Sequence, residues 1–129
     1  MADSGELRDF PQRLHHDTPA WVKTGSMFHV RIRALAEQVA ISALTQPELA
    51  SKLVGAAQNY HERHVWHCSL FLIMPDHVHA LLAFPADAPM AKTIGTWKRY
   101  ATRELGVKWQ DNFFDHRIRN DQEFTEKFA

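Results

Sequence analysis

HVWHCSLFLIMPDHVHALLAF, residues 64–84, contains two apolar runs that are separated by the dipeptide Pro75-Asp76. Runs rich in aromatic and β-branched residues are typical of strands, and proline followed by aspartate is typical of a tight turn. So short a connection joins two strands as an antiparallel pair. The first run is apolar enough to predict a strand in the middle of a sheet. The sequence therefore predicts an antiparallel hairpin with strands at 64–74 and 77–84.

Further elements are predicted on both sides of this hairpin. MFHVRIRA alternates between apolar and basic residues, so Phe28, Val30 and Ile32 should face a core while the side chains between them face outward. Two helices are predicted by apolar residues at helical spacing, with Pro47 opening one and Gly106 following the other. In chain order we expect an irregular arm at 1–22, strand 27–34, a stretch of loop with some helix at 35–45, helix 47–63, strands 64–74 and 77–84, helix 91–105, strand 113–119, and a last helix capped by Asn120 or Asp121. This order predicts an α+β, ferredoxin-like antiparallel sheet with helices packed on one face, formed by residues 23–129.

The composition limits the classes of function. At 129 residues with 45% hydrophobic content, the chain should form one globular domain. No apolar run is long enough to cross a membrane, the N-terminal stretch does not resemble a signal peptide, and one cysteine, Cys68, fits a reducing compartment. We therefore expect a cytoplasmic protein. Because the formal net charge is zero, a nucleic-acid partner would have to bind a local basic patch.

The spacing of His77 and His79 is the strongest chemical signal. Residues two apart in a strand point to the same face, so both imidazoles should project together while Val78 points into the core. Neutral imidazoles are common ligands of transition metals, which makes this pair a candidate metal site. The alternative is that the two rings only form hydrogen bonds with their neighbours.

The context of the pair resembles a known family. VWHCSLFLI followed by MPDHVHALL is similar to the signature strand of the HUH (His-hydrophobic-His) single-strand DNA transposases, in particular the REP-associated tyrosine transposases. TPAWVKTGSMFHVRIR resembles the entry into that group's first strand, and IGTWKRYATRELGVKWQDNFFDHRIRNDQEF resembles its helix and the following segment. The resemblance covers about residues 10 to 129 and several motifs in the same order.

The resemblance implies a ferredoxin-like fold and a divalent metal, magnesium or manganese, held by His77 and His79. In this family a tyrosine attacks a phosphate of single-stranded or hairpin DNA, and the cut strand is later rejoined to another end. The resemblance therefore implies a DNA transposase, a nickase and strand transferase that works through a 5′-phosphotyrosine. Magnesium prefers oxygen ligands, so two imidazoles suit manganese better.

The expected nucleophile is difficult to find among the tyrosines of this chain. Tyr60 is predicted to be a packed aromatic residue, and Tyr100 is only a weak candidate because it lies in the helix predicted at 91–105. In the resembling family the nucleophile lies in a final helix, whose opening is similar to DQEFTEKFA at 121–129. On that alignment the tyrosine would follow Ala129. We therefore expect either a fragment of a longer protein or a shortened, inactive descendant.

DNA contacts are predicted where basic residues alternate with aromatic ones, because such surfaces bind phosphates and stack bases. The candidates are Arg31, Arg33, Trp97, Lys98, Arg99, Arg103, Lys108, Trp109, His116, Arg117 and Arg119. The alternative for each stretch is an ordinary solvated face with ion pairs. Two other functions stay open: a non-catalytic DNA-binding protein that recognises repeat hairpins, and a small metalloenzyme unrelated to DNA. We expect a monomer or a homodimer.

Overall fold

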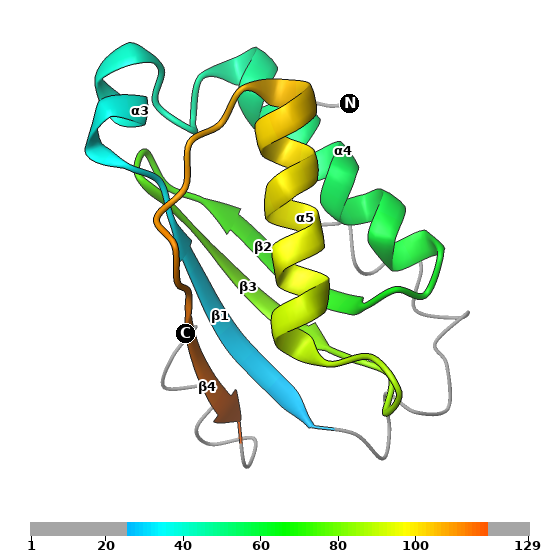
Figure 1. The fold of residues 1–129 in the computed structure, drawn as a ribbon. Helices are drawn as coiled ribbons and strands as arrows, with labels where there is room; N and C mark the ends of the chain where they lie inside the picture. The colour runs from blue at the N-terminus through cyan, green and yellow to red at the C-terminus, as the bar shows by residue number, and fades with distance from the viewer. Residues whose placement is uncertain (1–25, 119–129) are drawn as a thin grey trace.

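A computed structural model describes residues 26–118 and shows a four-stranded antiparallel sheet with two long helices on one face (Figure 1). The elements are β1 (Met27–Arg33), α3 (Ala36–Ile41), α4 (Pro47–Glu62), β2 (His67–Ile73), β3 (His77–Ala83), α5 (Met90–Leu105) and β4 (Phe114–Ile118). The strand order in the sheet is β2-β3-β1-β4. The chain passes from β1 to β2 through α4 and from β3 to β4 through α5, and in each case one other strand lies between the two connected strands. The predicted α+β, ferredoxin-like fold is confirmed.

Two expectations about the elements need comment. The first strand of the hairpin, β2, lies at an edge of the sheet, so its predicted position in the middle was wrong. Its apolar character has another cause, since Phe71 faces the core while Leu70 is paired with the buried Leu81 on the other face. The stretch at 35–45, which the sequence left open, contains the short helix α3. The N-terminal arm at 1–22, Arg119 and the last predicted helix lie outside the described residues.

The tight turn at Pro75-Asp76 is held by the chain on both sides of it. The backbone N–H of Met74 donates to the carbonyl oxygen of His77 at 2.8 Å, which closes the predicted hairpin. The carbonyl oxygen of Asp76 accepts from Ala34 N–H, just beyond β1, and that of Pro75 accepts from Leu44 N–H, both at 2.9 Å. The turn is therefore fixed relative to β1, which positions the first residues of β3.

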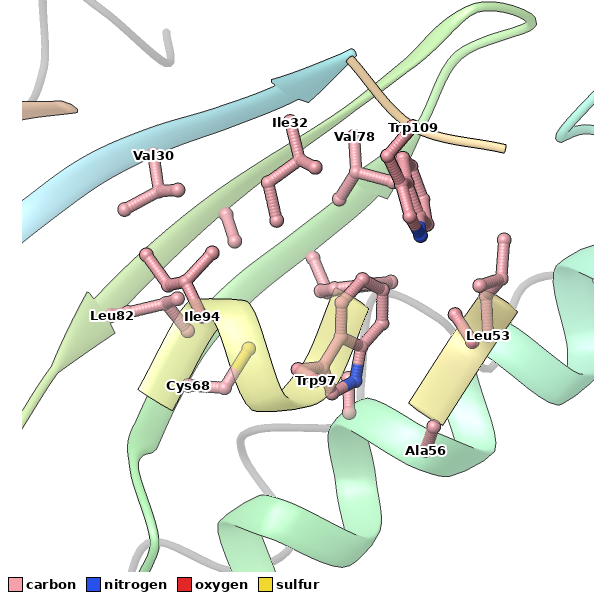
Figure 2. Close-up of a cluster of buried hydrophobic side chains, with 14 of the residues drawn as sticks. Val30, Ile32, Leu53, Ala56, Cys68, Val78, Leu82, Ile94, Trp97 and Trp109 are labelled. Atoms are coloured by element: carbon pink, nitrogen blue, oxygen red, sulfur yellow. The ribbon is translucent and has the colours of Figure 1, made fainter. Parts of the chain in front are cut away.

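The core lies between the sheet and the two long helices, and Trp97 of α5 is at its centre (Figure 2). The Trp97 ring is fully buried, and its centroid lies 5.8 Å from that of Phe71 and 5.7 Å from that of Trp109. Val30 and Ile32 face this core from β1, as their alternation predicted. The side chains that alternate with these core residues point to the other face of the sheet.

A buried histidine near the end of α4 should make the stability of the fold depend on pH. His61 is 4% exposed, and its Nδ1 accepts a hydrogen bond from the backbone N–H of Cys68 at 2.9 Å. Burial lowers the pKa of His61 from 6.5 to about 4, and the neighbouring His67, whose ring centroid is 4.8 Å away, adds to this effect. The unfolded chain therefore takes up a proton at a higher pH than the folded chain does.

We expect the free energy of unfolding to be highest above pH 6.5 and to fall by roughly 2 to 3 kcal/mol on acidification to about pH 4.5. Denaturant titrations across this pH range measure the effect. A His61→Asn variant can still accept the Cys68 hydrogen bond through its amide oxygen and does not titrate, so its profile should be flatter. The comparison variant is His64→Asn, at an exposed histidine with φ 60°, a conformation that asparagine tolerates. Because His64 is only the third and smallest cause of the lowered pKa of His61, this variant should flatten the profile much less than His61→Asn does. An unchanged slope in the His61 variant would contradict this assignment.

Candidate metal and DNA site

The site lies on the sheet face opposite α4 and α5. Strand β3 pairs with β1 so that His77 is opposite Arg33 and His79 is opposite Arg31. Directly paired residues of neighbouring strands point to the same face. Val78, between the two histidines, is fully buried in the core. The register therefore gathers two imidazoles and two guanidinium groups on one side of the sheet.

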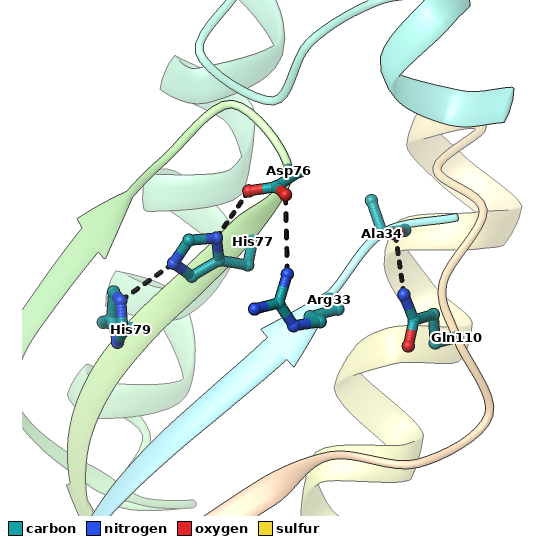
Figure 3. A network of polar contacts seen from close by, with 6 residues as sticks. All are labelled: Arg33, Ala34, Asp76, His77, His79 and Gln110. Carbon is teal, nitrogen blue, oxygen red and sulfur yellow. Dashed lines mark hydrogen bonds and ion pairs between the residues drawn. The ribbon is translucent and has the colours of Figure 1, made fainter. Parts of the chain in front are cut away.

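The two imidazoles converge, as their spacing predicted. Nε2 of His77 and Nε2 of His79 are 2.8 Å apart, and the ring centroids are separated by 4.5 Å (Figure 3). Two nitrogens bound at a right angle to one ion, with bonds of about 2.1 Å each, lie about 3.0 Å apart. The observed spacing and the donor type both fit a shared transition-metal ion.

Asp76 holds the first of these rings in place. Its Oδ1 lies 2.6 Å from Nδ1 of His77, and its Oδ2 lies 3.4 Å from Nη1 of Arg33 (Figure 3). The hydrogen bond with His77 lowers the pKa of Asp76 below its usual range. Asp76 is therefore ionised at neutral pH and can only accept, so the proton of His77 sits on Nδ1 and the Nε2 lone pair faces His79. A carboxylate in this position is a common way to orient a metal-binding histidine.

A third histidine, which the sequence did not single out as a site residue, holds the second ring. Nε2 of His29, in β1, lies 2.9 Å from Nδ1 of His79, and the two rings stack with centroids 5.2 Å apart. His29 is 7% exposed. The available signal was its outward position in the alternating strand 27–34, but its distance from His79 depends on the long-range pairing of β1 with β3.

The described residues supply two ligands and no more. Within residues 26–118, no group of three or more His, Cys, Asp or Glu side chains is arranged to hold a metal ion. His29 binds the far nitrogen of His79 and so cannot share an ion with the pair. The two Nε2 atoms can therefore hold a cation that keeps positions open for other oxygen ligands.

A shallow pocket of about 300 Å³ adjoins the histidines on the same face and is lined by Arg31, Arg33, Gln110, Asn112, Phe113 and Phe114. The guanidinium carbon of Arg31 lies 4.8 Å from the centroid of the Phe114 ring, and Phe114 is 43% exposed. Positive charge beside an exposed aromatic ring is suited to a phosphate and a neighbouring base. The sequence predicted the two arginines here but not Phe114.

The other predicted DNA contacts are distributed over different parts of the molecule. Trp97 and Trp109 are 0% and 9% exposed and pack in the core, so their prediction as stacking platforms was wrong. The apolar spacing of α5 takes Trp97 inward, and the bridge between Ala34 and Trp109 draws Trp109 against the sheet.

The predicted lysines are already engaged by the fold. Nζ of Lys98 donates to the carbonyl oxygens of Gln110 and Asp111 at 2.6 and 3.2 Å. Nζ of Lys108 pairs with the carboxylate of Glu37 at 3.2 Å. Both side chains therefore help to fix the segment that follows α5, and a role in DNA binding stays a prediction.

Strand β4 divides its residues between the two faces. His116 is paired with His29 and thus lies on the histidine face, whereas Arg117 is paired with Phe28, whose alternation with His29 places it on the other face. Arg99 and Arg103 belong to α5 and also lie on the helical side of the sheet. The predicted basic residues are therefore divided between the two sides of the sheet.

Neither tyrosine of the chain lies near the histidines. Tyr60 is on α4, with its ring centroid 5.0 Å from that of Trp66, and burial raises its pKa. Tyr100 is on α5 and is 36% exposed. Both line a groove between the helices, on the opposite side of the sheet from His77 and His79. This position contradicts Tyr100 as the nucleophile, and agrees with Tyr60 as a packed aromatic residue.

The fold is shared with two solved structures of transposases. A REP-associated tyrosine transposase bound to a REP hairpin superposes with a TM-score of 0.66 and 20% identity over 80% of this chain, which spans 62% of that protein. A crystal structure assigned to a transposase from Deinococcus radiodurans gives a TM-score of 0.60 and 14% identity, with 78% of this chain and 85% of that one covered. The resemblance seen in the sequence thus has a counterpart in the structure, and identities this low show the fold alone.

The other comparisons add no relatives. No protein-family model matches the chain, and no curated protein matches it. Among the helices of residues 26–118, none has the length and apolar character needed to span a membrane.

Proposed function

We propose that this protein is a transposase-type DNA-processing protein that binds single-stranded or hairpin DNA and places a phosphate at His77 and His79. The observation that carries the proposal is the convergence of two imidazole nitrogens at 2.8 Å beside the pocket that contains Arg31 and Arg33. The shared fold supports it, since one of the similar structures is a transposase bound to a hairpin.

In this proposal the residues of the histidine face bind and orient. His77 and His79 would hold a divalent ion, manganese or magnesium, which supplies positive charge to polarise a phosphate and to stabilise the charge that develops on its oxygens. Asp76 keeps the ring of His77 turned toward the site, and Arg33 supports Asp76. Arg31 and Arg33 neutralise neighbouring phosphates, and Phe114 offers a ring face to a base.

The chemical step of this proposal needs a tyrosine. The phenol gives up its proton as its oxygen bonds to phosphorus, the bond from phosphorus to the 3′ oxygen breaks, and that oxygen takes up a proton, so the number of protons is unchanged. The reacting atoms must approach within roughly 3 to 3.5 Å, which a tyrosine behind the sheet cannot do. The position of Tyr60 and Tyr100 therefore favours a second candidate for these 129 residues, a DNA-binding protein that recognises hairpins without cutting them.

The proposal includes a second DNA surface in the groove between α4 and α5. This groove has a volume of about 830 Å³ and is lined by Lys52, Gly55, Ala56, Asn59, Tyr60, Arg63, Thr96, Arg99, Tyr100, Arg103, Glu104 and Leu105. Four of these side chains are cationic and one, Glu104, is a carboxylate, which pairs with Arg103 at 2.9 Å. Among the described residues, no ion pair neutralises Lys52, Arg63 or Arg99. We propose that the phosphates of a DNA stem bind here.

Hairpin DNA should bind more tightly than a plain duplex of equal length, and affinity should fall steeply with salt because bound phosphates release counterions. Replacing Arg99 or Arg103 with glutamate should weaken binding about tenfold at roughly 0.1 M salt and reduce the slope of log affinity against log salt by about one each. Fluorescence anisotropy with a labelled hairpin oligonucleotide measures both quantities.

The matched control is Lys92→Glu, the same change from a cation to a carboxylate at an exposed side chain of α5 that does not line the groove. It should change affinity much less than the groove variants do. Equal affinity for hairpin and duplex would contradict the preference for hairpins, and the absence of a salt slope in the unmodified protein would contradict binding through phosphates. Equal effects of all three substitutions would contradict the groove alone.

A further inference from the structure

His29 contacts the histidine pair from a separate strand and from the side that faces away from the expected ion. Its Nε2 lies 2.9 Å from Nδ1 of His79, while Nε2 of His79 lies 2.8 Å from Nε2 of His77. His79 is therefore held at both ring nitrogens. The four side chains form a continuous row of hydrogen-bonding atoms, from His29 through His79 and His77 to Asp76.

We infer that His29 is the tautomer partner of His79. It acts as a positioning residue that lets His79 expose its Nε2 lone pair to a cation while Nδ1 of His79 stays hydrogen-bonded. This inference rests on the proposed function, because it concerns how the chain presents the same two ligands. It assigns to His29 the role that Asp76 has for His77.

The direction of the hydrogen bonds in the metal-free chain follows from Asp76. The carboxylate accepts from Nδ1–H of His77, so Nε2 of His77 is an acceptor. Nε2–H of His79 then donates to His77, and Nδ1 of His79 accepts from Nε2–H of His29. With every ring neutral, each contact in the row pairs one donor with one acceptor.

The contact between His29 and His79 must reverse when His79 acts as a ligand. His79 then carries its proton on Nδ1 and donates to Nε2 of His29, whose own proton moves to Nδ1. The number of protons on the row does not change. A neutral imidazole can serve in both directions, because it has one donor and one acceptor, whereas a carboxylate only accepts and an ammonium only donates.

The packing around His29 keeps this contact in place. Its ring stacks on that of His79 with an interplanar angle of 16°, and the edge contact with Phe114 has a centroid distance of 5.9 Å. Because the ring is 7% exposed, the surrounding side chains limit its rotation away from His79. A residue held in this way can fix the tautomer of its neighbour, which is how residues behind metal ligands increase affinity.

The inference can be tested with zinc alone as the probe, at about pH 8 where imidazoles are neutral. Nitrogen-15 spectra of the imidazoles should show His29 and His79 protonated on Nε2 and His77 on Nδ1 in the metal-free chain. Zinc should move the ring protons of both His29 and His79 to Nδ1 and leave His77 unchanged. His29→Phe keeps a ring of similar shape but no polar atoms, and should weaken zinc binding 10- to 100-fold by calorimetry.

His29→Gln separates this role from packing, since its amide can donate or accept, and it should recover most of the lost affinity. Thermal melting of both variants shows whether the fold survives. If His29→Phe folds poorly, the glutamine variant and the nitrogen-15 spectra test the inference instead. Unchanged tautomers of His29 on zinc addition, or full zinc affinity in a folded His29→Phe chain, would overturn the inference. If the unmodified chain binds no zinc, the proposed metal site of His77 and His79 is wrong. The role of His29 is refuted separately if the metal-free chain does not carry its ring protons on Nε2 of His29 and His79 and on Nδ1 of His77.

Discussion

Replacing either His77 or His79 with alanine is expected to lower the affinity for manganese or zinc by at least about 100-fold and to leave the fold intact. Loss of a residue that hydrogen-bonds to a metal ligand typically lowers metal affinity about 10- to 100-fold. Loss of a ligand itself should lower it more, because a site with two protein ligands among the described residues then keeps only one. Both side chains lie on the sheet face away from the core, so neither substitution opens a cavity beneath the helices. Calorimetric titration of the purified chain measures the affinity.

The control for this experiment is His64→Asn, which removes an exposed imidazole outside the site and should bind metal as the unmodified chain does. Circular dichroism reports whether each variant folds. Wild-type affinity in both alanine variants would disprove the metal site. Unfolding of His77→Ala would instead show that the pair serves the fold through its contact with Asp76.

A Trp97→Ala variant should lose about 3 to 5 kcal/mol of stability, the usual range for truncating a fully buried large aromatic residue. A domain of this size is commonly stable by only about 5 to 15 kcal/mol, so the substitution should remove a large part of the total stability. The ring touches residues from several elements, with centroids 6.0 Å from Trp66 and 5.8 Å from Phe71. Urea titration of the purified variant measures the loss.

Trp97→Phe provides the graded comparison. Nε1 of Trp97 is buried without a hydrogen-bond partner among the described residues, so phenylalanine removes volume but breaks no hydrogen bond and should cost less than alanine. Phe114→Ala, at a ring that is 43% exposed, should change stability much less. A Trp97→Ala chain that is fully stable but binds hairpin DNA poorly would restore Trp97 as a stacking residue.

Local patterns predicted the elements of this fold well. Alternation in the strand at 27–34 and the turn at Pro75-Asp76 each have a short-range physical cause, and both are confirmed. The edge position of β2 was missed because an apolar run shows that both faces of a strand are packed but not how many strands lie beside it. That information depends on pairing between distant segments.

The same limit explains the mixed result at the site. The convergence of His77 and His79 follows from their spacing alone, so it could be predicted. His29 was missed because its contact with His79 depends on the register of β1 against β3, fifty residues further along the chain. For Trp97, the basic neighbours suggested DNA while the helical spacing suggested the core, and only packing could decide between them. Phe114 joined the site for a similar reason, through the pairing of β4 with Arg31.

The placement of the histidines and the helical groove on opposite sides of the sheet has a consequence for the shape of DNA that could use both. The sheet and its helices separate the two surfaces, so a straight rod of duplex that lies along one surface leaves the other empty. A DNA hairpin with a rigid double-stranded stem and a flexible single-stranded flank can contact both surfaces by passing around the edge of the sheet. The protein would then select such DNA through the positions of its two binding surfaces and would need no contact with the edge of any base.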